Sequence, residues 1–239
     1  MSVHLVGGGW QDAPDGAEYA EFIAEASARA AASGRDVPRI AVVSIRDGDG
    51  DDHAAKLIAA SSPAGAFEPH ITAVDHHGGV PATAFADVDG ILVGGGLTPV
   101  YRELLEPHFG EIRRQVADGV PYLGFSAGAA IAADSAILGG WRIGDVPVCP
   151  EEAGEDLDEV TVAEGLALVD LAVDAHAVQW GTLARVIAAT EAGILDGAVA
   201  IDESTVLIVG DGALRVEGRG NVWQVSEDSA GVLVRTVGS

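Results

Sequence analysis

Short apolar runs alternate with segments of helical spacing along most of the chain, and this alternation limits the fold more than any other feature. In the first half, strands are predicted at 3–6, 40–45, 71–74, 90–93 and 120–124, and helices at 17–33, 52–60 and 98–118. Continuously apolar strands that alternate with helices are typical of a parallel sheet covered on both faces. We therefore expect an α/β fold with three layers, built on a doubly wound, mostly parallel sheet.

The second half has a different pattern. Residues 139–159 carry prolines and an acidic cluster and predict a loop, followed by a strand at 166–173 and a helix at 182–192. Strand-like runs at 197–201, 205–209, 213–216 and 221–225 then follow one another with turn signals between them, which predicts a C-terminal antiparallel β extension. Because neither a low-complexity linker nor an internal repeat interrupts the chain, we expect a single domain over residues 1–239.

Charge and composition exclude several classes of partner. The net charge is -24, and Lys56 is the only lysine. A field of this sign repels phosphate backbones and anionic membranes, so neither nucleic acid nor a membrane is an expected partner. Cys149 is the single cysteine, and the sequence shows neither a secretory signal nor an apolar run of membrane-spanning length. We expect a cytoplasmic protein, and a homodimer is compatible with this interpretation.

The segment Gly124-Phe125-Ser126-Ala127-Gly128 is the strongest chemical motif. It lies between an apolar run and an alanine-rich, helix-prone run, so Ser126 is expected on a sharp strand-to-helix turn. Such a turn exposes a serine hydroxyl, and the flanking glycines tolerate its strained backbone. We interpret Ser126 as a nucleophile, and a simple glycine-rich turn is the alternative.

A serine nucleophile needs a base to accept its proton and an acid to orient that base. His176 is the only histidine after Ser126 and follows a predicted strand, where the chemistry of parallel sheets gathers. His76 and His77 are the runner-up bases. Three residues are candidates for the orienting acid, and the sequence alone does not separate them: Asp174, Asp202 and Glu203.

The oxyanion of a tetrahedral intermediate needs two preorganised N–H donors. The N–H of Ala127, directly after the nucleophile, is one candidate. The glycine turn after the strand at 90–93 would supply the second, from Gly95 or Gly96.

Cofactor and metal motifs fail on inspection. Asp12 and Pro99 stand where the third glycine of a dinucleotide-binding fingerprint would be. The acidic run 47–52 lacks both the glycine at position six and the glutamate at position twelve of a calcium-binding loop. The segment Asp75-His76-His77 has no partner histidine at helical spacing. We therefore expect no cofactor and no metal.

Taken together, the motifs resemble those of the serine peptidase family of cyanophycinases and aspartyl dipeptidases. The resemblance rests on the glycine turns at 7–9 and 94–96, the elbow at 122–129, the strand ending in Asp174-Ala175-His176, and Ile201-Asp202-Glu203. It implies a class I glutamine amidotransferase-like (flavodoxin-like) fold and a triad of Ser126, His176 and Glu203. In the dipeptidase branch the acid would come from nearer the nucleophile, from Asp134 or Asp145.

Two departures from this family concern specificity. Gly96-Leu97-Thr98 stands where cyanophycinases have Asp-Gln after the glycine turn, and Arg185 is the one arginine left in the stretch after His176. A small peptide or amide is therefore the expected substrate, with Thr98, Asp174 and Gln179 lining the pocket and Trp180 as an apolar wall. The alternatives are an esterase of the α/β-hydrolase type and a non-catalytic binding protein that keeps the scaffold.

Overall fold

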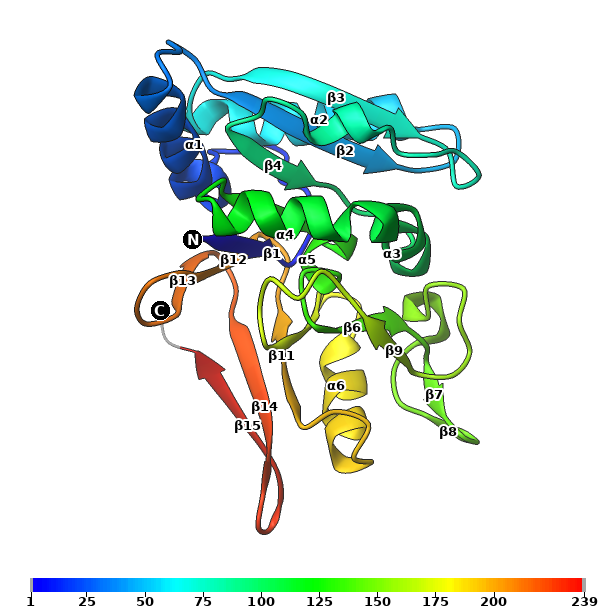
Figure 1. The fold of residues 1–239 in the computed structure, drawn as a ribbon. Helices are drawn as coiled ribbons and strands as arrows, with labels where there is room; N and C mark the ends of the chain where they lie inside the picture. Colours follow the sequence, from blue (N-terminus) through cyan, green and yellow to red (C-terminus); the bar gives the residue numbers. More distant parts are fainter. Residues whose placement is uncertain (1, 238–239) are drawn as a thin grey trace.

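The computed structural model describes residues 2–237. Its main feature is a sheet of seven strands with helices on both sides (Figure 1). Its strand order is β13-β12-β1-β5-β4-β2-β3. The strands are β1 (Val3–Val6), β2 (Arg39–Ile45), β3 (Glu68–Val74), β4 (Gly90–Val93), β5 (Tyr122–Phe125), β12 (Thr205–Val209) and β13 (Arg215–Gly218). Strands β1 to β5 pair in parallel, whereas β12 pairs antiparallel with both β1 and β13. The predicted α/β fold with a mostly parallel sheet is confirmed.

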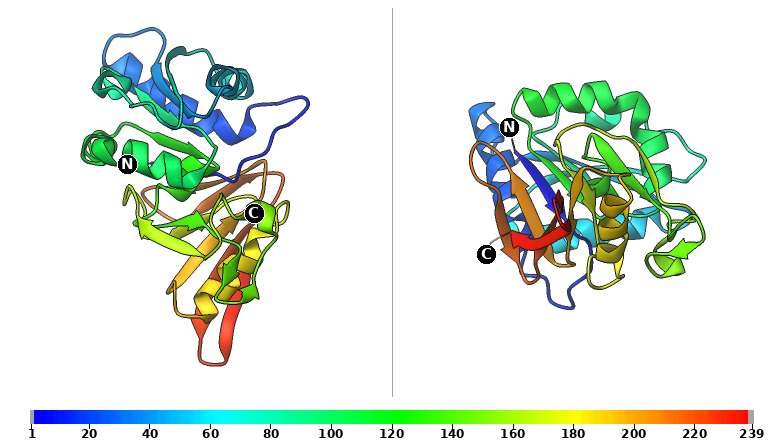
Figure 2. Two further views of the ribbon diagram at one scale, coloured as in Figure 1. Left: turned by 90° about the vertical axis from the view of Figure 1, so that its right-hand side faces the viewer. Right: turned by 90° about the horizontal axis from the view of Figure 1, so that it is seen from below.

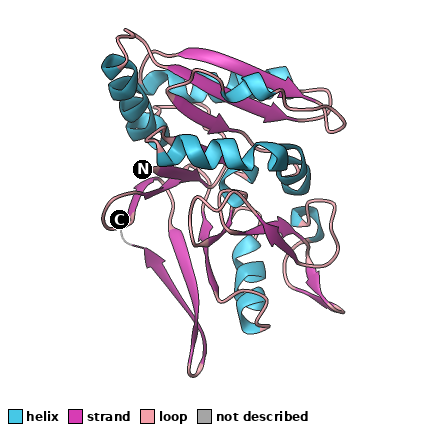
Figure 3. Ribbon diagram, viewed as in Figure 1, coloured by secondary structure: helices cyan, strands magenta, loops and turns pink. Residues whose placement is uncertain are grey.

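Helices cover both faces of this sheet (Figure 3). One face packs against α1 (Ala20–Ala32) and α2 (Gly50–Ser61). The other packs against α3 (Thr98–Leu105), α4 (Phe109–Ala117) and α5 (Ala127–Ala130). Side chains of a strand alternate between faces, so both faces of a central strand are apolar here.

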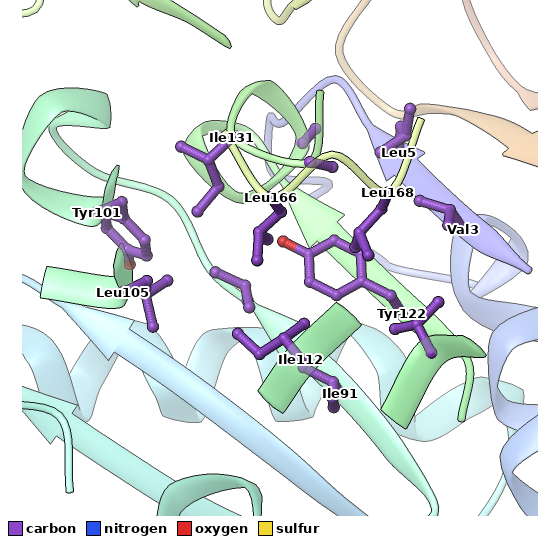
Figure 4. Packing of buried hydrophobic residues seen from close by; sticks show 14 of the residues in the cluster. Val3, Leu5, Ile91, Tyr101, Leu105, Ile112, Tyr122, Ile131, Leu166 and Leu168 are labelled. Atoms are coloured by element: carbon purple, nitrogen blue, oxygen red, sulfur yellow. The ribbon is translucent and has the colours of Figure 1, made fainter. Parts of the chain in front are cut away.

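Strand β2 illustrates this alternation. Ile40 and Val42 belong to the core under α1 and α2, whereas Ala41 and Val43 belong to the core under α3 and α4. Figure 4 shows the second of these cores, with the fully buried Tyr122 ring at its centre. The strands form continuous apolar runs in the sequence because helices cover both faces of the sheet.

A second sheet of four strands lies beside the first and carries the C-terminal hairpin (Figures 1 and 2). It contains β10 (Ala172–Asp174), β11 (Gly197–Ile201), β14 (Val222–Asp228) and β15 (Gly231–Val237). Strands β10 and β11 are parallel, and the other two pairs are antiparallel. Helix α6 (Thr182–Glu191) packs on this sheet through Val186 and Ala189. The predicted C-terminal strands exist, but they are divided between the two sheets.

Short elements complete the chain. The strands β6 (Ser135–Gly139) and β9 (Thr161–Glu164) form one pair, and β7 (Arg142–Ile143) and β8 (Val146–Pro147) form another. The 3₁₀ helices are η1 (Ala17–Tyr19), η2 (Ser62–Ala64), η3 (Ala82–Phe85), η4 (Glu106–His108) and η5 (Glu151–Ala153). None of the helices within residues 2–237 combines the length and apolarity needed to cross a bilayer.

Three predicted elements differ from the structure. The strand predicted at 166–173 is reduced to β10, because the backbone of residues 165–168 hydrogen bonds to the segment after α5, as in Leu166 N–H to Ile131 O at 2.7 Å. The helix predicted at 98–118 is divided by η4, where Pro107 cannot donate the hydrogen bond of a continuous helix. The loop predicted at 139–159 contains β7, β8 and η5.

Candidate active site

Ser126 occupies the turn between β5 and α5 with φ 54° and ψ -110°, a backbone conformation that is costly for any residue except glycine. Its neighbours make the turn feasible. A Cβ at position 124 would lie 2.2 Å from the carbonyl oxygen of Gly128, and a Cβ at position 128 would lie 2.3 Å from the carbonyl oxygen of Val93. Only glycine therefore fits at positions 124 and 128, and these two glycines allow the sharp turn from strand to helix at Ser126.

His176 lies two residues after β10, also in the left-handed region with φ 55°. Its Nε2 is 2.8 Å from Ser126 Oγ. The ring stacks on Trp180, with 3.8 Å between ring centroids and 7° between planes. A Cβ at position 8 would lie 2.3 Å from His176 Cε1, so the glycine at position 8 gives the ring its space.

Glu203 follows β11 and completes the chain of contacts. Its Oε1 lies 2.7 Å from His176 Nδ1. The backbone N–H of Glu203 donates to Gln179 Oε1 at 3.0 Å, which ties this turn to the segment after His176. Because β10 and β11 are parallel neighbours, their carboxyl ends present His176 and Glu203 together. These two residues come from the second sheet, and Ser126 comes from the central sheet, so the site lies where the two sheets meet.

Asp174 takes a different partner from the one expected. Residues two apart on a strand point the same way, but β10 ends at Asp174 and the chain turns before His176. The Asp174 carboxylate forms a two-point ion pair with Arg185, with both N–O distances 2.8 Å. Both residues are buried. Asp174 therefore does not orient His176, and its charge is already compensated.

The predicted oxyanion donors are not equivalent. Position 95 lies against the nucleophile, since a Cβ there would be 2.8 Å from Ser126 Cβ. However, the N–H of Gly95 donates to Nε2 of His53 at 3.1 Å. Burial lowers the pKa of His53 to about 4, so its neutral ring accepts this bond. The N–H of Gly95 is thus already used, and Gly96 and Ala127 remain of the predicted set.

A narrow cavity beside Ser126 brings together two of the three predicted substrate-binding residues, Thr98 and Asp174, with Trp180 as one wall. Thr98 is the first residue of α3, and Leu97 holds the N-cap position. Gln179 does not line this cavity and instead supports Glu203.

Glu155 is a site residue that the sequence did not reveal, because it lies in a segment without periodicity. Its Oε2 accepts the N–H of Thr98 at 3.0 Å, and it lines the cavity beside Ser126. Burial raises the pKa of Glu155 to about 7. A second cavity of about 410 Å³ shares Glu155 and Trp180 with the first and is edged by Trp141. The approach to Ser126 is therefore aromatic and acidic.

Comparisons with known proteins relate the chain to peptidases. The model of "Peptidase family S51" matches residues 70–217, which is more than half of the chain. Two proteins named "Peptidase E", from Shewanella sp. (strain W3-18-1) and Shewanella putrefaciens (strain CN-32), are 45% identical over 60 residues. That match spans 23% of this chain and only 24% of each relative.

Two solved structures share the fold. A peptidase from an acI-B1 Actinobacterium aligns over 100% of this chain and 95% of its own, with a TM-score of 0.60 and 18% identity. A putative Peptidase E protein from Listeria monocytogenes EGD-e aligns over 92% of this chain and 98% of its own, with a TM-score of 0.55 and 14% identity.

Proposed function

The chain belongs to peptidase family S51, and on this premise we propose that it is a serine peptidase or amidase that acts through an acyl-enzyme at Ser126. One observation carries the proposal: Ser126 Oγ, His176 and Glu203 form a continuous line of contacts at 2.8 Å and 2.7 Å. These are the distances at which a nucleophile, a base and an orienting acid exchange and hold protons. We also infer that the scaffold is of the class I glutamine amidotransferase type.

The protons move along this line. Glu203 accepts the Nδ1 proton of His176, which leaves Nε2 free to accept the proton of Ser126 as Oγ bonds to the substrate carbonyl carbon. The N–H groups of Ala127 and Gly96 are the proposed donors to the resulting oxyanion. His176 then gives the proton to the leaving nitrogen, and the C–N bond breaks.

Water completes the cycle. It gives a proton to His176 as its oxygen bonds to the acyl carbon, and Ser126 recovers its proton when the acyl group leaves. Trp180 covers one face of the His176 ring at 3.8 Å, which limits the positions that the imidazole can adopt.

The substrate class follows from the surroundings of Ser126. The adjoining cavity is narrow, and its carboxylates are Asp174 and Glu155, of which only Asp174 is paired with an arginine. Once Glu155 is ionised it would repel an anionic group there, so we propose a small peptide or amide without a negative charge next to the cleaved bond. Thr98 and Asp174 line this cavity, and Trp180 gives its apolar wall. No observation favours the esterase alternative, since the matched family and the reported relatives are peptidases.

Labelling of the purified protein with a fluorophosphonate, followed by mapping of the modified residue, tests the nucleophile. We expect label on Ser126, none in the Ser126→Ala variant, and a loss of turnover of at least about 10³-fold in that variant. A panel of α- and β-aspartyl dipeptides, neutral dipeptides and cyanophycin tests the substrate class. Label on another serine, or turnover of esters without any peptide-bond cleavage, would contradict the proposal.

A further inference from the structure

A third cavity, of about 340 Å³, adjoins the contacts between Ser126, His176 and Glu203 without being lined by any of these three residues. Gly8 and Gly9 form part of its wall, and both also touch the site: a Cβ at position 8 would meet the His176 ring, and one at position 9 would lie 2.6 Å from Glu203 Oε2. The backbone of Gly8 and Gly9 therefore lies between this cavity and the base and acid. Its volume is at the lower end of the range for small-molecule sites.

The cavity is mainly apolar. Val6 and Phe125, at the carboxyl ends of β1 and β5, line it together with Tyr19 and Trp10. The rings of Trp10 and Phe125 lie 4.8 Å apart, and 46% of Trp10 is exposed. Figure 2 shows the segment after β1 as a dark blue loop at the edge of the molecule, and this segment forms one side of the cavity. An apolar side chain of a ligand would replace water against these rings.

Two polar groups of the cavity lack a charged partner. Glu18 is only 5% exposed, and its carboxylate accepts a hydrogen bond from the Gln11 amide but forms no ion pair within residues 2–237. Gln11 Oε1 is buried and has no hydrogen-bond partner among the described residues. Burial of a carboxylate without a cation is costly. The Glu18 carboxylate therefore suits a ligand ammonium group, which carries a positive charge and hydrogen-bond donors.

Lys56 provides the opposite charge. It lines the cavity from α2, one helical turn before Ala59 and Ala60, which line it as well. The side chain is exposed, and within the described residues no carboxylate lies within ion-pairing distance of it. The only lysine of a strongly acidic chain thus stands beside an apolar cavity, where it suits a ligand carboxylate.

We propose that this cavity binds a free α-amino acid with an apolar side chain. The ammonium group pairs with Glu18, the carboxylate pairs with Lys56, and the side chain packs on Trp10 and Phe125. A zwitterion with an apolar side chain satisfies both charges and the apolar wall together. The inference does not depend on the proposed catalytic function, because none of these contacts involves Ser126.

Isothermal titration of the wild-type protein with L-leucine and L-phenylalanine measures this binding directly. N-acetyl-phenylalanine lacks the ammonium group and should bind to the wild type at least about tenfold more weakly than phenylalanine. Phenylalanine should bind to the Glu18→Gln variant at least about tenfold more weakly than to the wild type. In both cases a buried charge-assisted contact is lost. Phenylalanine amide, and the Lys56→Met variant, should show a smaller loss of about threefold, because Lys56 is exposed to solvent.

Two further variants make the result decisive. Ala59→Trp fills the cavity from an exposed helix position and should abolish binding even if Glu18→Gln fails to fold. Glu155→Gln lies in the other cavity and should leave the affinity unchanged. The proposal is overturned if no binding is detected up to about 10 mM, if N-acetyl-phenylalanine binds as well as phenylalanine, or if Glu155→Gln rather than Ala59→Trp removes binding.

Discussion

Asp202 and Glu203 are consecutive in the chain, yet their carboxylates have separate partners. Glu203 Oε1 lies 2.7 Å from His176 Nδ1, whereas Asp202 accepts hydrogen bonds from the backbone N–H groups of Val178 and Asn221 and from the indole N–H of Trp223. Asp202 is 3% exposed, and the Glu203 side chain is 28% exposed. The Asp202 carboxylate therefore ties the segment after β10 to the start of β14, and the Glu203 carboxylate is free to act on the histidine.

Substitution of Glu203 by Gln should lower kcat by about 10³- to 10⁴-fold, the scale observed when the acid of a serine triad is replaced by its amide. The melting temperature should change little, because the Glu203 side chain is partly exposed. Asp202→Asn is the matched control. It should reduce the unfolding free energy by about 1–3 kcal/mol through its buried hydrogen bonds while retaining turnover in the folded fraction. Peptidase assays and urea titrations of both variants measure these effects. If Asp202→Asn loses kcat and Glu203→Gln retains it, Asp202 rather than Glu203 is the orienting acid.

Substitution of Arg185 by Met should destabilise the protein by about 3–5 kcal/mol, because it leaves the buried Asp174 carboxylate without its cation. Adding Asp174→Asn to this variant should recover much of the loss, since the uncompensated charge is then gone. Chemical denaturation of the single and double variants measures the coupling. If the single and the double variant are equally stable, the loss in Arg185→Met does not come from the uncompensated charge of Asp174.

Substitution of Glu155 by Gln should stabilise the protein above pH 7. Burial raises the folded pKa of Glu155 to about 7 from an ordinary value of 4.5, so between these values the folded state holds a proton that the unfolded state has lost. Stability from this group is therefore full below pH 4.5 and declines as the pH rises through 7. The gain in the variant should be about 1–3 kcal/mol at pH 8, allowing for partial exposure of the side chain, and should vanish near pH 4.

Urea titrations of wild type and Glu155→Gln across pH 4–8 test this. Asp156→Asn, at the adjacent exposed position, should not reproduce the effect. A variant that is less stable than wild type at pH 8 would contradict the prediction.

His53 should give a pH dependence of the opposite sign. Burial lowers its folded pKa to about 4 from 6.5, so between these values the unfolded state binds a proton that the folded state does not. Stability from this group is full above pH 6.5 and is lost as the pH falls through 4, by up to about 3 kcal/mol. His53→Gln keeps an acceptor for the Gly95 N–H and should remove this slope. The exposed His77→Gln variant is the control, and an unchanged slope in His53→Gln would refute the assignment.

Much of this protein could be read from local sequence. The β2 and β4 strands, the mostly parallel sheet and the sharp turn at Ser126 follow from apolar runs, helical spacing and two glycines, since each depends on residues close in the chain. The resemblance also pointed to Glu203. From the residues alone, however, Asp174, Asp202 and Glu203 were equally good partners for His176.

The tertiary structure separated these three carboxylates. Asp174 is paired with Arg185, Asp202 is bound by Val178, Asn221 and Trp223, and only Glu203 meets His176. In the same way, His53 accepts a hydrogen bond from the N–H of Gly95, which is 42 positions away in the chain. Glu155, which lies in a segment without helical or strand periodicity, accepts a hydrogen bond from the N–H of Thr98. Strand and turn preferences are local, so sequence determines where polar side chains stand along the chain. Which charge compensates which depends on distances across the folded core, and these exist only once the two sheets have packed together.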